Sequence, residues 1–270
     1  MSAVDPTRPA DPIRPADPIL EVTGVAVRFG GVAALSDVNL TVAAGSVTGL
    51  IGPNGAGKTT LFNVISGLQP ADRGEVRYRG RSLAGLPPYR RARLGIARTF
   101  QRLELFGSLS AAENVQVGVE ASSSWWPWRR RPVPLADGSV PKPPAAVSEE
   151  LLVRVGLAGA GASQSSAMPT GLARMVELAR ALSIDPALLL LDEPCSGLDD
   201  AESEVLGRLL RQLARAGAAI LLVEHDMELV MRVCDWVHVL DFGEVIASGT
   251  PEQIRNDRAV QAAYLGTVAP

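Results

Sequence analysis

The segment from Gly52 to Thr60 constrains the fold of this 270-residue chain more than any other part of its sequence. An apolar run, Val47 to Ile51, precedes the segment, and a helical pattern from Thr60 to Ser66 follows it. A glycine-rich loop between a strand and a helix lets successive backbone N–H groups curl inward around an anion. The helix that follows adds its positive dipole end at the same point. The sequence therefore predicts a phosphate cradle in an α/β fold.

Side chains within this loop indicate which phosphates it holds. Lys58 is placed to reach the β- and γ-phosphates of a nucleoside triphosphate, and the hydroxyl of Thr59 is placed to ligate Mg²⁺. The predicted nucleotide-binding set is Gly52, Pro53, Asn54, Gly55, Ala56, Gly57, Lys58, Thr59 and Thr60. The strand before the loop and the helix after it favour a bound nucleotide over an unliganded glycine-rich turn.

Charge and composition exclude several classes of protein. The 26 basic and 29 acidic side chains are intermixed and give a formal net charge of −3, so no basic face for nucleic acid is expected. Two cysteines, Cys195 and Cys234, are too few for a disulfide framework and are expected to be core filler. The longest apolar runs, residues 187–191 and 216–223, are far shorter than the roughly 20 residues that cross a bilayer. We therefore expect another chain to supply any membrane part.

The N-terminal region divides into a tail and a pair of strands. Residues 8–13 and 14–19 repeat the sequence Arg-Pro-Ala-Asp-Pro-Ile, and proline at this density forbids helix and ladder pairing. Residues 1–18 are therefore predicted to be a disordered or extended tail. Strands are predicted from Leu20 to Arg28 and from Val38 to Val42, the second with the alternation of a half-solvated antiparallel strand.

Helical patterns dominate the middle of the chain and predict an inserted helical subdomain at about residues 100–182. The predicted helices are Ser110–Val119, Ser148–Val155 and Gly171–Leu182. Residues 121–147 are rich in Pro, Ser and Trp and are predicted to be a loop. Its Trp125, Trp126 and Trp128 precede three arginines, which suits a lipid headgroup zone or a partner groove, but an exposed variable insertion is the favoured interpretation.

Strand–helix alternation resumes after Pro186. Apolar strands are predicted at residues 188–191 and 218–223, helices at 199–215 and 227–234, and a closing hairpin at 236–240 and 244–248. Continuous apolar strands followed by helices indicate a parallel sheet that is covered on both faces. The helical subdomain thus interrupts an α/β core.

Two carboxylates at the end of the first of these strands are predicted to complete the site. The strand delivers Asp192 to the carboxyl edge of the sheet, beside the phosphate loop, where it can hold Mg²⁺ through water. Glu193 follows directly and is placed to orient or deprotonate the water that attacks the γ-phosphate.

The order of these motifs resembles the ATP-binding subunit of ATP-binding-cassette (ABC) transporters over residues 19–266, which leaves residues 267–270 as a short tail. The resemblance implies an ABC cassette with a parallel core, an antiparallel N-terminal β subdomain and an inserted helical subdomain. Phe29 matches the aromatic residue that stacks on adenine, and Gln101 the glutamine that senses Mg²⁺ and water. Asp199 closes the loop that crosses the dimer interface, and His225 matches the histidine that contacts the γ-phosphate.

The family signature, usually Leu-Ser-Gly-Gly-Gln, is altered at residues 168–172. This chain has Met168, Pro169, Thr170, Gly171 and Leu172 there. In the family this helix N-terminus faces the nucleotide of the partner subunit, and Pro169, Thr170 and Gly171 are assigned to that contact by the resemblance. Leu172 removes a polar contact, which predicts either a weakened half-site for the partner's nucleotide or a tolerated variation.

The resemblance also implies a function, a set of partners and a location. The glutamine-loop segment 95–106 is similar to that of branched-chain amino-acid importers; the ending, residues 247–266, is shared with lipopolysaccharide-export ATPases. The expected protein is an ATPase that uses ATP and Mg²⁺ at the cytoplasmic face of the membrane. Expected partners are integral-membrane permease subunits, a second ATP-binding subunit (a heterodimer is favoured over a homodimer) and, indirectly, an extracytoplasmic solute-binding protein. The expected transport is import of branched-chain or related amino acids. The alternatives are a lipopolysaccharide-export-type ABC ATPase, a nucleotide-binding regulatory subunit with impaired hydrolysis at one composite site, and a soluble ABC protein acting on ribosomes or DNA.

Overall fold

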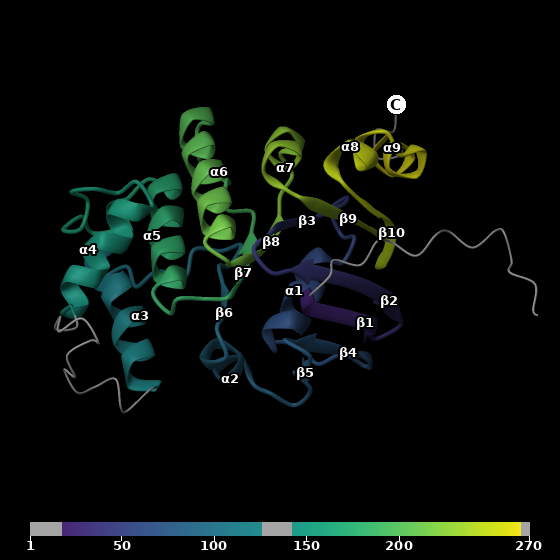
Figure 1. The fold of residues 1–270 in the computed structure, drawn as a ribbon, viewed down its shortest axis with the longest axis horizontal. Helices are drawn as coiled ribbons and strands as arrows, with labels where there is room; N and C mark the ends of the chain where they lie inside the picture. Colours follow the sequence, from purple (N-terminus) through teal and green to yellow (C-terminus); the bar gives the residue numbers. More distant parts are fainter. Residues whose placement is uncertain (1–17, 126–141, 266–270) are drawn as a thin grey trace, which may run out of the picture.

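The computed structural model of the protein describes residues 18–125 and 142–265 (Figure 1). A four-stranded antiparallel sheet forms the N-terminal side, in the order β2-β1-β4-β5. Its strands are β1 (Pro18–Phe29), β2 (Val32–Ala43), β4 (Arg73–Tyr78) and β5 (Arg81–Ser82). Both strands predicted in this region are present and are longer than predicted, and Pro18, assigned to the tail, begins β1.

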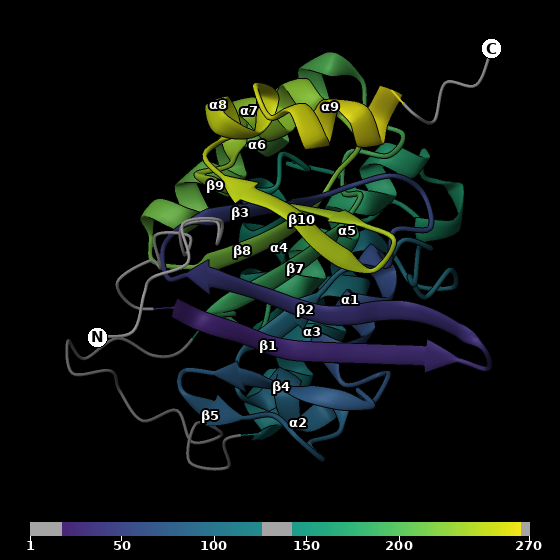
Figure 2. The same ribbon diagram turned by 90° about the vertical axis from the view of Figure 1, so that its right-hand side faces the viewer.

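A six-stranded sheet forms the core, in the order β10-β9-β3-β8-β7-β6. Five strands are parallel, and β10 pairs antiparallel with β9. The strands are β3 (Val47–Ile51), β6 (Ile96–Arg98), β7 (Leu188–Asp192), β8 (Ala219–Val223), β9 (Trp236–Asp241) and β10 (Glu244–Gly249). Figure 2 shows this sheet above the long antiparallel strands β1 and β2.

Both faces of the core sheet are covered, as the apolar strands predicted. Leu189 and Leu191 of β7 belong to the core shared with α6 (Asp200–Arg215) and α7 (Met227–Val233). Leu188 and Leu190 belong to the second core, shared with α1 (Lys58–Ser66) and the antiparallel sheet. The two-residue period of a strand separates these cores, because successive side chains point to opposite faces. One face is therefore covered by helices and the other by a helix together with a sheet.

The helical subdomain is inserted between β6 and β7. It contains α3 (Ala111–Trp125), α4 (Pro144–Arg154) and α5 (Thr170–Leu182), grouped to one side of the core sheet in Figure 1. Both predicted ends of the loop at residues 121–147 were wrong. Helix α3 continues to Trp125, and α4 begins at Pro144 because proline fits the first turn of a helix, where no N–H partner is needed.

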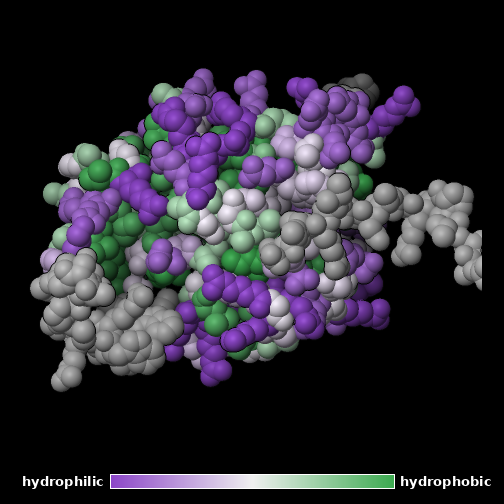
Figure 3. All heavy atoms as spheres, in the orientation of Figure 1, coloured by the Kyte–Doolittle hydropathy of each residue, from purple (hydrophilic) through white to green (hydrophobic). Residues whose placement is uncertain are grey.

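Short helices complete the described chain: α2 (Pro88–Arg93), α8 (Pro251–Arg255) and α9 (Arg258–Leu265). The predicted tails at residues 1–17 and 267–270, and Trp126 and Trp128, lie outside the described residues. Figure 3 shows hydrophilic residues over α6 and the C-terminal helices, whereas hydrophobic residues gather around the helical subdomain. Within residues 18–125 and 142–265, none of the helices has both the length and the apolar character that a membrane span requires.

Parallel pairing brings the predicted site together. The carboxyl ends of β3, β7 and β8 meet at one edge of the sheet, followed by Gly52, Glu193 and Glu224, respectively. Strand β6 pairs in parallel with β7, so the chain that leads to Gln101 leaves from the same edge. This edge is where open α/β sheets bind their ligands.

Candidate functional site

The loop after β3 is a cradle that only glycine fits at its closest approaches. Gly52 has φ 148°, and a Cβ there would lie 1.9 Å from the Leu240 carbonyl oxygen. Gly57 has φ 107°, and a Cβ there would lie 2.5 Å from the carbonyl oxygen of Ala34. Residues other than glycine are excluded at both positions for two reasons: the positive φ is unfavourable for them, and their Cβ would clash with a carbonyl oxygen.

Lys58 begins helix α1 at the mouth of this cradle. Its Nζ donates hydrogen bonds to the carbonyl oxygens of Gly52, at 2.6 Å, and Pro53, at 2.9 Å. Burial lowers the pKa of Lys58, and the nearby carboxylates of Glu193 and Asp192 oppose that shift. No side chain caps the N-terminus of α1, so its first-turn N–H groups are available to an anion.

A cavity of about 480 Å³ lies over the cradle, within the range of roughly 300–1,000 Å³ that small-molecule sites occupy. It joins the loop to residues in the segments that follow β6, β7 and β8. The lining residues are Ala34, Asn54, Gly55, Ala56, Gly57, Lys58, Thr59, Thr60, Gln101, Glu193 and His225. The structure thus brings together the phosphate loop and all three predicted catalytic residues, and adds Ala34, which no motif indicated.

Glu193 and His225 meet at the floor of this cavity. The Nε2 atom of His225 lies 2.5 Å from Oε1 of Glu193. Glu193 has φ 51°, a left-handed conformation, and its N–H donates to the carbonyl oxygen of Val223 at 2.9 Å. A non-glycine residue in this region is held there at a cost of about 1–2 kcal/mol, which is typical of functional sites. The turn aims the carboxylate at the cavity instead of along the strand.

Asp192 is held by a buried partner that the motifs did not indicate. Its Oδ2 atom lies 3.2 Å from Nη2 of Arg98, and the two side chains are 1% and 7% exposed. Burial raises the pKa of Asp192, and Arg98 opposes that shift. Arg98 also donates from Nη1 to Asn63 and Ser66 at the end of α1. The sequence analysis predicted neither the strand β6 that Arg98 ends nor its partner.

Glu224 is a second buried residue that sequence reasoning left without a role. Its carboxylate accepts hydrogen bonds from the backbone N–H groups of Cys195, at 2.8 Å, and His225, at 3.1 Å. Glu224 thereby ties the turn after β7 to the turn after β8, which carry Glu193 and His225.

Burial raises the pKa of the half-buried Cys195 to about 12, and that of the buried Cys234 to about 12, which agrees with the predicted role of both as core filler.

The signature residues lie apart from this cavity. Pro169 caps the start of α5 and Thr170 begins it, while a Cβ on Gly171 would lie 2.8 Å from the Gly197 carbonyl oxygen. Asp199 caps α6 in a reciprocal pair with Glu202. None of these residues belongs to the described lining of the cavity. Phe29, at the end of β1 and 52% exposed, does not belong to it either.

Comparison with known proteins assigns the family. The model of the ABC transporter family matches residues 35–196. The chain belongs to the ABC transporter ATP-binding family. A second model, for the branched-chain amino acid ATP-binding cassette transporter, matches residues 244–270. The chain is therefore an ABC ATPase, a protein that binds nucleotide.

Relatives and solved structures agree over almost the whole chain. The high-affinity branched-chain amino acid transport ATP-binding protein LivG of Escherichia coli K12 is 39% identical, covering 92% of this chain and 97% of the relative. BraF of Pseudomonas aeruginosa, of the same description, is 38% identical with the same coverage. The lipopolysaccharide export ATP-binding protein LptB of Haemophilus influenzae is 33% identical, covering 86% and 90%. The ADP conformation of MJ1267, an ABC transporter cassette, superposes with a TM-score of 0.79 at 27% identity, covering 92% and 99%.

Proposed function

We propose that this chain is the ATP-hydrolysing subunit of an importer of branched-chain or related amino acids. The match of residues 244–270 to the branched-chain cassette model carries the proposal. That segment contains β10, α8 and α9, which pack together at one end of the core sheet. Relatives named for branched-chain transport are also more similar over more of the chain than the lipopolysaccharide-export relative.

The site residues support a division of labour in hydrolysis. Lys58 and the first turn of α1 bind the phosphates, and Glu193 takes the proton of the attacking water or orients it. His225, in contact with Glu193, faces the γ-phosphate, and Gln101 closes the cavity from the side of β6. Phe29 stacks on adenine from the exposed end of β1.

The donor set at and beside the cavity fits magnesium. Thr59 and Gln101 line the cavity and supply a hydroxyl and an amide oxygen. We assign the carboxylate oxygen to Asp192, which is buried against Arg98 directly before Glu193 in the chain; these are the hard ligands that Mg²⁺ prefers. Among the residues described, no three or more His, Cys, Asp or Glu side chains cluster as metal ligands. This agrees with an ion held jointly with substrate phosphates, the usual arrangement for Mg²⁺. When bound, the ion neutralises charge that develops on the phosphates.

The place of the signature residues supports pairing with a second cassette. Pro169, Thr170 and Gly171 start helix α5 away from this chain's own cavity, so we assign them, with Asp199, to the nucleotide of a partner subunit. A heterodimer with a sister ATP-binding subunit is our preferred assembly. The second candidate function is a regulatory subunit in which one composite ATP site is weakened. Leu172 supports it, because this side chain packs against the apolar core and offers no polar contact to the partner's nucleotide.

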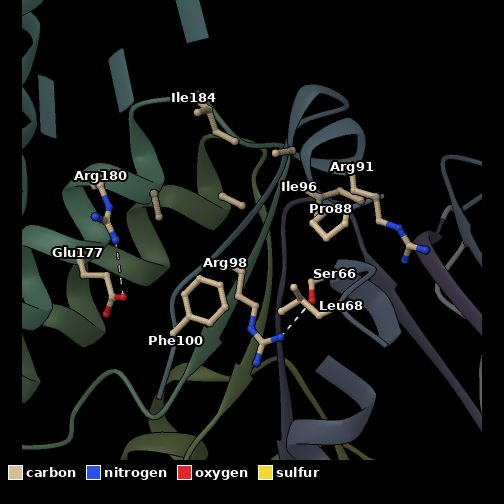
Figure 4. A pocket seen from close by; sticks show the side chains of 13 residues that line it. Ser66, Leu68, Pro88, Arg91, Ile96, Arg98, Phe100, Glu177, Arg180 and Ile184 are labelled. Atoms are coloured by element: carbon tan, nitrogen blue, oxygen red, sulfur yellow. Dashed lines mark hydrogen bonds and ion pairs between the residues drawn. The ribbon is translucent and has the colours of Figure 1, made fainter. Parts of the chain in front are cut away.

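A second cavity is our proposed docking surface for the membrane partner. It has a volume of about 280 Å³ and lies between α2 and β6 on one side and α5 on the other. Phe100 and Arg98 lie side by side in its wall, and Glu177 and Arg180 lie on the side of α5 (Figure 4). Its apolar walls and arginines suit a short segment of a permease subunit with an acidic residue. Permease binding here places the chain peripherally at the cytoplasmic face of the membrane, with a solute-binding protein acting on the far side.

The test is purification of the complex through a tag on this chain, followed by uptake of radiolabelled leucine in vesicles that contain it. We expect permease subunits to copurify and ATP-dependent uptake that unlabelled isoleucine competes away. Copurification with lipopolysaccharide-export components, or ATP-dependent transport that ignores amino acids, refutes the assignment of substrate. Absence of any membrane subunit refutes the proposed assembly.

A further inference from the structure

The loop that carries Gln101 is fastened to helix α5 by a buried arginine. Arg174 donates from Nη1 to the carbonyl oxygen of Phe100 at 2.6 Å and from Nη2 to the carbonyl oxygen of Gln101. The side chain of Arg174 is 7% exposed. A planar guanidinium that holds two consecutive carbonyls fixes the direction of the peptide between them, which a single flexible donor does not do. The loop and the helix therefore share one rigid contact.

Glu177, one turn further along α5, faces the same arginine. Its Oε2 atom lies 3.6 Å from Nη1 of Arg174, and its Oε1 atom lies 4.0 Å from Nη2 of Arg180. Among the described residues, Nε of Arg174 is buried with no hydrogen-bond partner. Burial raises the pKa of Glu177, and Arg174, Arg180 and the backbone N–H groups of Phe100 and Glu104 oppose that shift. Glu177 thus supplies charge, while the two loop carbonyls fix the orientation of the Arg174 fork.

Arg174 connects two regions that serve different purposes. It lies one turn after Thr170, where α5 begins, and the residues at that start do not line this chain's cavity. Gln101, which Arg174 holds by its carbonyl, does line the cavity. A displacement of the start of α5 therefore reaches the cavity through this contact, because packed interiors transmit small shifts.

We propose that Arg174 is a positioning residue that holds Gln101 at the phosphate cavity and carries movements of the start of α5 to it. The glutamine acts at the nucleotide, and Arg174 acts only through the glutamine. One consequence rests on the proposed dimer: since the start of α5 then contacts the partner's nucleotide, Arg174 links the two ATP sites.

A double-mutant cycle of Arg174→Met and Gln101→Ala tests the proposal in the full-length complex. We expect Arg174→Met to lower kcat about 10- to 100-fold, the effect of a small misplacement of a catalytic group. The KM for ATP should stay within about threefold of wild type, because the cradle at Gly52 to Thr60 is untouched. In the Gln101→Ala background the Arg174→Met change should have an effect of less than about twofold. If the fold-losses of kcat in the two single variants multiply in the double variant, the two residues act independently and the proposal is overturned.

Two further variants keep the result interpretable. Arg211 on α6 also donates to two backbone carbonyls, those of Arg232 and Val233, so Arg211→Met removes the same kind of contact elsewhere and should leave kcat unchanged. If Arg174→Met does not fold, Arg174→Lys retains the charge but has a single donor nitrogen in place of the planar fork, and its partial loss of kcat should vanish in the Gln101→Ala background. Persistence of that loss overturns the proposal. A wild-type complex that hydrolyses ATP but transports no amino acid refutes the proposed function and leaves this inference standing.

Discussion

The Nε2 atom of His225 lies 2.5 Å from Oε1 of Glu193, although the two residues are 32 positions apart in the chain. They follow β8 and β7, neighbouring parallel strands whose last residues pair as Asp192 with Val223. The contact therefore results from strand register, and Glu224 stabilises it by bonding to the backbone of both turns. Because Glu193 and His225 touch each other at the cavity, each limits the positions open to the other.

Glu193→Gln should abolish hydrolysis and preserve nucleotide binding. The amide keeps the shape of the side chain and its contact with His225 but cannot accept a proton from water. We expect the ATPase rate of the complex to fall about 10²- to 10⁴-fold, with binding of a fluorescent ATP analogue unchanged. Glu204→Gln is the matched control, because Glu204 lies exposed on α6 in ion pairs with Arg208 and Arg232. Activity within twofold of wild type in Glu193→Gln would remove Glu193 from the catalytic role.

Lys58→Met should weaken nucleotide binding itself. The ammonium group of Lys58 is the cation that the cradle already holds in place through the Gly52 and Pro53 carbonyls. Loss of a charge-assisted hydrogen bond costs about 1.5–3 kcal/mol, so the dissociation constant of ATP should rise about 10- to 150-fold. Equilibrium titration with a fluorescent ATP analogue measures this. Lys142→Met, which removes an exposed lysine paired with Glu150, should bind ATP like wild type; equal affinities for all three proteins would contradict the prediction.

Leu172→Gln tests whether the altered signature is a weakened half-site. A glutamine there restores a polar contact to the partner's nucleotide, which should raise the ATPase rate of the assembled complex about two- to tenfold, the worth of one hydrogen bond of about 0.5–1.5 kcal/mol. Leu172→Met retains the apolar contact of Leu172 with the core and should change nothing. An unchanged rate in Leu172→Gln identifies Leu172 as a tolerated variation.

His238 should make the fold less stable as the solution is acidified. This residue of β9 is buried, with Nδ1 2.7 Å from the Ser248 hydroxyl and Nε2 3.1 Å from the carbonyl oxygen of Thr41. Burial lowers the pKa of His238 from 6.5 to about 4. Between these values the unfolded chain binds the extra proton, so stability is fully present above about pH 6.5 and falls as the pH decreases toward 4.

The measurement is urea unfolding of wild type and His238→Gln at pH 7.5 and pH 5.0. Wild type should lose about 2 kcal/mol more than the variant over this interval, because each unit of pKa difference is worth about 1.4 kcal/mol. Other titrating groups contribute to both proteins and cancel in the comparison. Parallel losses in the two proteins would show that His238 does not titrate as its burial requires.

Some contacts at the site were visible in the sequence and others were not. The phosphate loop, Gln101, Glu193 and His225 were predicted to form one site, and residues 54–60 of the loop line one cavity with the other three. Glycine spacing and an apolar strand indicated the loop and Glu193, whereas Gln101 and His225 were assigned by the family resemblance. Arg98, Arg174 and Glu224 carried no such signal, because a buried charged residue is recognised only by its partner, and those partners lie 94, 73 and 29 positions away.

The sequence by itself determined the phosphate loop, the parallel core and the inserted helices. These follow from glycine spacing, apolar runs and helical periodicity, which are local properties of the chain. The order of its motifs also carried the resemblance to the family. Only the tertiary structure decided that Arg98 holds Asp192, that Glu224 joins the two catalytic turns, and that Arg174 fastens Gln101 to α5. A buried charged side chain needs a partner close to it in space, and that partner can lie far away in the sequence. The contacts that position the catalytic groups therefore depend on how the sheets and helices pack.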